Sequence, residues 1–282
     1  MLGTFLAALL TVFPNHGIEE SFADYLYELG EYGMASSEYL RIIYSHDEDT
    51  LSCPLAALRL ARCWQELGRR EDALLLYGYL RRNLTDAELR AGAMMGAGSV
   101  LEESGNYTAA RELYLNAAVT SEDIDLMGRA GIMSCLMDAQ MGNWDASAEG
   151  LRSISAAGGP FCEISENLAA QVAEGNGLSH RSPLWCGISS ALLPGSGQAI
   201  CGHYTDGIIA FGVNGAMVWL FYESLQESNT TTSVLLGWLS LSFYGGNIYG
   251  GSRAAVTYNS ARRRELLDEV TRILEDQQRF RP

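Results

Sequence analysis

The chain has 282 residues, enough for two domains of ordinary size, and a formal net charge of −15 at pH 7. All 19 basic residues are arginine, which excludes lysine Schiff-base chemistry and a Walker-type phosphate loop. The acidic excess falls in residues 18–180, with 26 Asp and Glu against 11 Arg, and a surface of this sign repels nucleic acid. We therefore expect protein partners with basic or amphipathic surfaces, unless the charge serves only solubility.

Residues 1–17 begin with an apolar run, Met1 to Phe13, and end in the polar segment Pro14 to Gly17. The run is similar to the hydrophobic region of a signal peptide, but the positive charge that normally precedes such a region is missing. We interpret the segment as a signal peptide or, alternatively, as a hydrophobic cap on the first repeat. A misplaced start codon would also explain it.

A glycine recurs in residues 18–180 with spacings of 38, 37 and 37 residues. Small side chains stand seven residues before and five after each glycine, and a large one stands nine after it. The glycines are Gly30, Gly68, Gly105 and Gly142; the small residues are Ala23, Ala61, Gly98, Cys135, Ala35, Ala73, Ala110 and Ser147; the large ones are Tyr39, Tyr77, Tyr114 and Leu151. Small residues let helices approach closely, and glycine ends a helix at low cost, so the pattern predicts four helix pairs. The fourth is the least regular, because Asp138 replaces an apolar residue.

The segments LARCWQELGRREDALLLYGYL and VLEESGNYTAARELYLNAA resemble the tetratricopeptide repeat, a helix-turn-helix unit. The resemblance implies an all-α solenoid over residues 18–180 that holds a protein or peptide ligand in its concave face without a cofactor. A capping helix is expected from Phe161 to Glu174. Residues 175–182 then form the boundary to the next part of the chain.

Residues 181–259 are nearly free of charge and rich in glycine. Two runs, residues 207–222 and 234–250, predict a short transmembrane hairpin, each at the low end of the roughly 17–25 residues needed. With two spans, the flanking arginines place the repeats in the cytoplasm. If the stretch 184–200, interrupted by Pro194, crosses as well, the repeats lie opposite the C-terminus. We favour this second arrangement, with periplasmic repeats and a bacterial inner-membrane location.

We interpret the small and amide residues inside the predicted spans as contacts that hold the helices together rather than as a transport path. Gly246 and Gly250 form a GxxxG pair, which allows close helix packing in lipid. Asn214 and Asn247 are expected to hydrogen-bond to each other, because an unpaired amide is costly in a membrane.

The segments LLPGSGQAICGHYTDG, FYGGNIYGG and AAVTYN resemble a module of uncharacterised bacterial membrane proteins that often follows tetratricopeptide repeats. The residues that carry the resemblance are Pro194, Gly195, Gly197, Gln198, Gly202, Asp206, Gly207, Asn214, Tyr244, Gly246, Asn247, Tyr249, Gly250, Tyr258 and Asn259. The resemblance implies a membrane location, contact with membrane lipids and membership of a membrane-protein complex, but no activity. Cys201 departs from the tyrosine that the family commonly carries after the glutamine.

Residues 260–282 predict an amphipathic helix. Its apolar face comprises Leu266, Val270, Ile273 and Leu274. The three arginines at residues 262–264 either sit on anionic lipid headgroups or belong to a helix that folds back on the hairpin.

No catalytic, cofactor-binding or metal-binding residue is predicted, so the chain is expected not to be an enzyme. The six cysteines lack metal-ligand spacing, and the four histidines lack a nucleophile and an acidic partner in a recognisable motif. His203 and Asp206 permit a proton relay but equally mark a polar helix start. The leading hypothesis is a membrane-anchored scaffold for protein partners. The alternative is a membrane helper for lipid or polypeptide movement or insertion.

Overall fold

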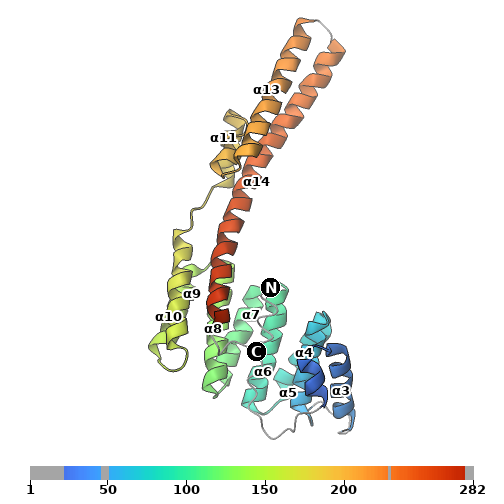
Figure 1. Cartoon of the computed structure of the whole chain (residues 1–282), viewed down its shortest axis with the longest axis vertical. Coiled ribbons are helices and arrows are strands. Elements are labelled where there is room, and N and C mark those ends of the chain that lie inside the picture. The colour runs from blue at the N-terminus through green and yellow to red at the C-terminus, as the bar shows by residue number, and fades with distance from the viewer. Residues whose placement is uncertain (1–21, 46–50, 228–229, 277–282) are drawn as a thin grey trace. The chain divides into compact units, whose positions relative to one another are not determined.

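The computed structural model describes residues 22–45, 51–227 and 230–276, and all regular structure in these residues is helical (Figure 1). The predicted all-α class is therefore confirmed. The chain divides into two compact units, one from residues 1–176 together with 267–282 and the other from residues 177–266. Residues 1–17, predicted to be a signal peptide or a cap, lie outside the described residues.

The first unit is a succession of helices, each of which contacts the next along the chain. The helices are α2 (Phe22–Glu28), α3 (Tyr32–Ser45), α4 (Pro54–Glu66), α5 (Arg70–Asn83), α6 (Ala87–Glu103), α7 (Tyr107–Thr120), α8 (Ile124–Met141), α9 (Trp144–Ala156) and α10 (Cys162–Ala173), followed by the 3-10 helix η1 (Glu174–Gly177). In addition, α4 contacts α6, and α6 contacts α8. In the described residues, α5, α7 and α9 make no comparable contact with one another. α4, α6 and α8 therefore form the inner layer of the stack.

Each of the four recurring glycines follows the first helix of its pair, α2, α4, α6 or α8, in the left-handed conformation, with φ between 76° and 86°. In each case the glycine amide donates to the carbonyl three residues earlier, and the following amide donates to the carbonyl five residues earlier, at 2.8–3.0 Å. This is the Schellman arrangement, which satisfies carbonyls that the helix end leaves free. The glycines thus set where each pair turns.

The recurring small and large residues occupy the core between the helices. Ala35, Ala73, Ala110 and Ser147 are fully buried, and so are the large residues that stand four positions later. A Cβ at Gly96 would lie 2.4 Å from the ring of Tyr77, and a Cβ at Gly98 would lie 2.7 Å from the ring of Tyr114. The tyrosine rings therefore fill space that glycine leaves open.

Asp138, the irregular residue of the fourth repeat, joins neighbouring helices by polar contacts. The Nε of Arg111 on α7 donates to Asp138 Oδ2 at 2.6 Å, and Asn143 Nδ2 donates to Asp138 Oδ1 at 3.4 Å. An ion pair between α7 and α8 therefore replaces the apolar contact made by the other repeats at this position.

The C-terminal turns of α14 (Thr230–Asp276) belong to the first unit. Leu267, Val270 and Leu274 are buried in the hydrophobic core that also contains Ile164 and Leu168 of α10. Residues 267–274 are therefore not folded back on the second unit, which was one of the two arrangements expected from the sequence. Whether the arginines at 262–264 meet lipid headgroups, the other expectation, stays a prediction. The end of a helical stack exposes apolar surface, and the apolar face of these turns covers it.

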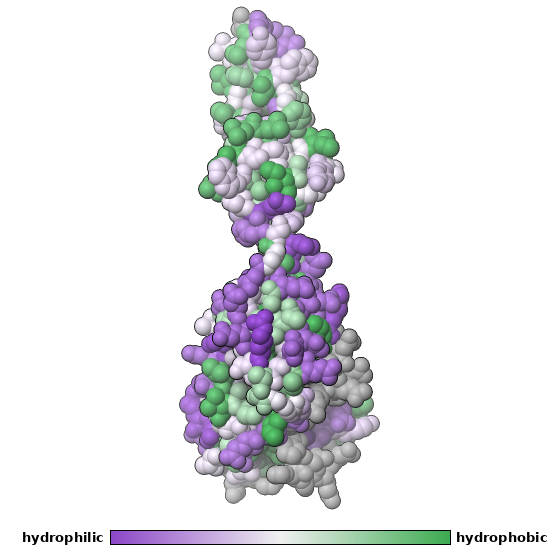
Figure 2. Space-filling view, turned by 90° about the vertical axis from the view of Figure 1, so that its left-hand side faces the viewer, coloured by the Kyte–Doolittle hydropathy of each residue, from purple (hydrophilic) through white to green (hydrophobic). Residues whose placement is uncertain are grey.

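The second unit consists of α11 (Pro183–Leu192), α12 (Ser196–Ile200), α13 (Tyr204–Gln226) and α14 as far as residue 266. By length and composition α13 can cross a membrane, and it extends beyond the predicted span of residues 207–222 at both ends. No other helix in the described residues meets this measure, although the second predicted span lies within α14. Hydrophobic side chains cover parts of the hairpin surface, at the top of Figure 2.

The expected third crossing over residues 184–200 is interrupted. Ten residues of α11 span about 15 Å, half the roughly 30 Å of a bilayer core. The chain then turns at Pro194 and continues as the five-residue helix α12. Residues 184–200 are therefore too short, as helices, to cross.

Candidate functional site

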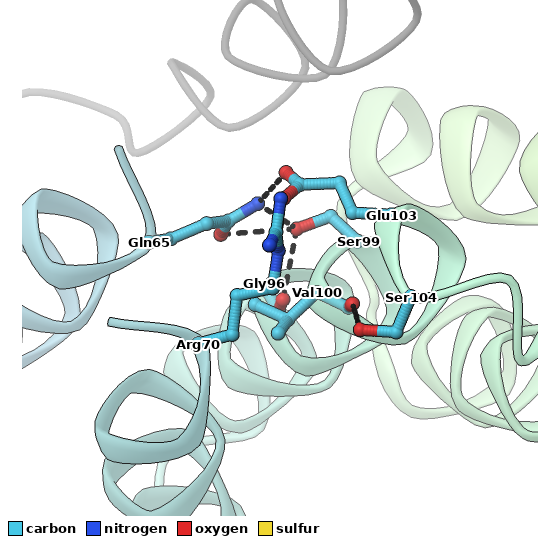
Figure 3. A network of polar contacts seen from close by, with 7 residues as sticks. All are labelled: Gln65, Arg70, Gly96, Ser99, Val100, Glu103 and Ser104. Carbon is cyan, nitrogen blue, oxygen red and sulfur yellow. Dashed lines mark hydrogen bonds and ion pairs between the residues drawn. The ribbon is translucent and has the colours of Figure 1, made fainter. Parts of the chain in front are cut away.

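Polar side chains connect α4 to α6 in the inner layer of the first unit (Figure 3). Gln65 Nε2 donates to Ser99 Oγ at 3.0 Å and to Glu103 Oε1 at 2.6 Å. The Nε of Arg70, at the start of α5, donates to Glu103 Oε2 at 3.2 Å. Gln65 and Ser99 are buried, so this network fixes the register between successive pairs by hydrogen bonds shielded from water.

Glu102 lies next to this network in the sequence and is 7% exposed. Its Oε2 accepts a hydrogen bond from the Tyr114 hydroxyl at 2.9 Å, whereas Oε1 has no partner in the described part of the chain. Burial raises the pKa of Glu102 to about 7, against the opposing effect of the Tyr114 hydrogen bond. The carboxyl group therefore titrates near neutral pH.

Arg62, on the same helix as Gln65, is 8% exposed, and its guanidinium lies 5.2 Å from the centre of the Tyr27 ring. Its Nε is fully enclosed and has no hydrogen-bond partner within residues 22–45, 51–227 and 230–276. Glu66, one turn further on, is near enough for Arg62 to lower its pKa, although burial raises that pKa more strongly. Among the described residues the guanidinium forms no ion pair within 4.0 Å, so its charge is incompletely compensated.

In the second unit, five residues form what we call the amide cluster: Ser190, Gly195, Gly197, Gln198 and Asn247. Asn247 Oδ1 accepts from the Gly195 amide at 2.9 Å, and Asn247 Nδ2 donates to the Ser190 carbonyl at 2.7 Å. The Ser190 hydroxyl donates to Gln198 Oε1 and accepts from the Gly197 amide, both at 3.0 Å. The cluster therefore joins α11, α12 and α14 through buried polar groups that satisfy one another.

Glycines allow the backbones to approach each other at this cluster. A Cβ at Gly195 would lie 1.9 Å from the carbonyl oxygen of Gly207 on α13, and one at Gly197 would lie 2.1 Å from that of Cys186. A Cβ at Gly250 would lie 2.9 Å from Gln198 Nε2. Gly195, Gly197 and Gly250 are therefore required by close contact between helices.

The expected hydrogen bond between Asn214 and Asn247 is not formed. Asn214 Nδ2 donates instead to the Ala210 carbonyl of its own helix at 2.7 Å, while both ends of the Asn247 amide are used in the amide cluster. The physical need for amide partners was correctly identified, but the α11–α12 turn supplies the partner of Asn247. Pro194 marked the interruption of this stretch, but nothing in the sequence pattern indicated that the turn lies against Asn247.

A cleft of about 560 Å³ lies beside the amide cluster. Its polar lining includes Gln198, Asp206, Asn214 and Asn247, and its apolar walls come from α13 and α14. Gly246 borders the cleft and has open space at its Cβ position, so it does not pack as the expected GxxxG pair with Gly250.

Among the other motif residues, Tyr258 and Asn259 lie at the entry to the second unit, Tyr249 lies on its surface, and the half-buried Tyr244 hydroxyl donates to the Ala191 carbonyl of α11. Asn259 Oδ1 accepts from the Arg181 amide and Asn259 Nδ2 donates to the Arg181 carbonyl, both at 2.8 Å, while the Arg181 guanidinium lies 5.6 Å from the centre of the Tyr258 ring. Tyr249 is exposed and accepts from Arg253 Nη1 at 3.3 Å. Asn259 therefore ties the incoming chain to α14.

His203 and Asp206 lie 3.7 Å apart, and both side chains are exposed at the start of α13. The described residues contain no group of three or more His, Cys, Asp or Glu that could hold a metal ion. The geometry of this pair fits a polar helix start at a membrane surface as well as a relay.

Sequence reasoning missed Ser190, Cys186 and Cys201. Ser190 is fully buried and joins two elements of the amide cluster, and the two cysteine sulfurs lie 3.6 Å apart. A serine in an apolar run carries little signal by itself. The proximity of the cysteines depends on the turn at Pro194, which brings residues 15 positions apart together.

Comparisons of the chain with protein-family models, with curated protein sequences and with solved structures find no significant match. Function is therefore argued from the residues and their geometry.

We expect the free energy of unfolding to fall by on the order of 3 kcal/mol between pH 4.5 and pH 7 because of Glu102. In this range the native carboxyl group keeps its proton while the unfolded one releases it, so the native state binds more protons and loses stability as pH rises. Denaturant titrations of the full chain in detergent at several pH values measure this slope. Glu102→Gln should remove it, and the exposed Glu112→Gln control should keep it. Equal slopes in all three proteins would contradict the assignment.

Gly197→Ala should destabilise the second unit by about 3 kcal/mol, because the new methyl group would collide with the Cys186 carbonyl. Thermal unfolding of the full chain in detergent, followed by tryptophan fluorescence, measures the effect. Gly212→Ala is the matched control, since a Cβ at that helical position meets nothing within 4 Å. If both variants unfold at the same temperature as the parent protein, the prediction that close packing requires glycine at residue 197 is wrong.

Proposed function

We propose that this chain is a membrane-anchored scaffold that holds a protein partner on the inner layer of a tetratricopeptide-like solenoid. The observation that carries the proposal is Arg62, which is 8% exposed, has an enclosed Nε without a hydrogen bond and forms no ion pair with any residue that the structure describes. An incompletely compensated buried charge is costly, and a partner that brings an acceptor to it would recover that cost on binding.

The surroundings of Arg62 support a peptide ligand. The rings of Tyr27 and Tyr32 meet edge to face with centres 5.3 Å apart, next to the guanidinium. Aromatic side chains and arginine are the residue types that most often carry binding energy at protein interfaces. The regular inner layer, held by the network of Gln65 and Ser99, supplies a rigid support for this site.

We propose that α13 and residues 230–250 of α14 anchor the chain in a bacterial inner membrane. Trp219, Val234, Trp238 and Leu241 are exposed on these helices, as lipid-facing residues would be. Residues 267–274 share a hydrophobic core with the repeats, so both lie on the same side of the proposed membrane. The chain between residues 177 and 266 would then cross that membrane an even number of times. The arginines at 262–264 then favour cytoplasmic repeats, in place of the periplasmic location preferred from the N-terminal run.

A second candidate function is a membrane helper for lipid or polypeptide movement. The cleft of about 560 Å³ favours it, because polar groups of Asp206, Asn214 and Gln198 line a hollow between helices that are otherwise apolar. This role requires a ligand in the cleft and none on the repeats.

Site-specific photo-crosslinking in cells tests the scaffold. With a benzophenone amino acid at Glu66 in the inner layer, we expect discrete crosslinked products, because a partner at Arg62 would lie within reach. The same probe at the exposed Leu75 of α5 is the matched control and should give none of these products. Arg62→Ala should abolish them and the exposed Arg82→Ala should not. Identical products from both probe positions, or products insensitive to Arg62→Ala, would count against the scaffold.

Cysteine labelling tests the proposed topology. A single cysteine at the exposed Thr85, in a chain whose six native cysteines are replaced, should react with a membrane-impermeant maleimide only after the cells are permeabilised. Labelling of intact cells would place the repeats outside the cytoplasm and overturn the proposed arrangement.

A further inference from the structure

Two cysteines of the second unit face each other. The Sγ atoms of Cys186 on α11 and Cys201 at the end of α12 lie 3.6 Å apart, and both residues are nearly inaccessible to solvent. No other pair of cysteines is in contact in the described residues. A disulfide requires an S–S distance of about 2.05 Å, so the sulfurs need to approach by only about 1.5 Å.

The surroundings hold the two thiols together. Positions for a Cβ at Gly197 and Gly251 lie 2.1 and 2.8 Å from the Cys186 carbonyl oxygen, so α12 and α14 pack directly on the backbone at Cys186. Ala255 of α14 is fully buried in the same small hydrophobic cluster as both cysteines. This packing fixes the backbone at Cys186 and encloses both cysteines.

We propose that Cys186 and Cys201 are a redox pair that closes to an intramolecular disulfide and clamps α11 to the turn before α13. Oxidation by a diazene such as diamide illustrates the chemistry. One thiol adds across the N=N bond, and the second thiol attacks the sulfur that is now bound to nitrogen. The S–S bond forms, the S–N bond breaks, and the hydrazine product carries away both hydrogens and both electrons.

The proposed bond would act on the amide cluster. The segment that it closes contains Gly195, Gly197 and Gln198, each of which contributes a hydrogen bond to that cluster. Closing a loop of this size reduces the freedom of the unfolded chain far more than that of the native one. Oxidation would therefore hold the α11–α12 turn, and the cleft beside it, in the present arrangement.

The test uses the full chain in detergent, treated with diamide and then with N-ethylmaleimide, digested with pepsin and mapped by mass spectrometry without reduction. We expect one linked peptide pair containing Cys186 and Cys201, two hydrogens lighter than the sum of its thiol forms. The midpoint of thermal unfolding should rise by roughly 5–10 °C after oxidation. Reduction with dithiothreitol should reverse both changes.

Cys201→Ser should lose the linked peptides and the rise in midpoint, whereas Cys162→Ser, which removes a thiol of the first unit, should keep both. The linked peptide in the parent protein is itself decisive, so the test does not depend on either variant folding. Two maleimide-labelled thiols at these positions after oxidation would overturn the proposal. So would a bond from either cysteine to another cysteine or to a second chain.

Discussion

The side-chain amide of Asn247 is the contact on which the second unit depends. Its oxygen and nitrogen bind the backbone on both sides of the Pro194 turn, at Gly195 and at Ser190. A helix that runs in a largely apolar environment has few polar groups with which to position its neighbours, so a satisfied amide has a large effect. The close approach at Gly195, Gly197 and Gly250 is what brings the backbone within reach of it.

In the first unit, too, glycines allow a side chain of one helix to position its neighbour, but that side chain is an aromatic ring. Where the second unit uses an amide, the repeats use large rings packed against glycine, as Tyr77 does against Gly96. The left-handed glycines end each inner helix at the same point, so the rings recur in register. The polar residues of successive inner helices then meet, as Gln65 of α4 meets Ser99 and Glu103 of α6.

The two units are joined in sequence by α14, whose last turns complete the hydrophobic core of the repeats. This arrangement has a consequence for function. If α14 were removed together with the proposed anchor, Ile164 and Leu168 of α10 would lose the cover of Leu267, Val270 and Leu274 and be exposed to water. We therefore expect the repeats to lose stability if the rest of α14 is deleted, so the two parts do not behave as independent modules.

The sequence by itself determined the helical class, the four turn glycines and the small and large positions around them, because these follow from local periodicity and from the conformational freedom of glycine. It also indicated that Asn214 and Asn247 need partners. Only the tertiary structure decided which partners they have, where the C-terminal helix packs, and that Cys186 meets Cys201. Those contacts join residues that are distant in the chain. The local sequence pattern predicts which face of a helix is apolar, but it does not predict which distant segment packs against that face.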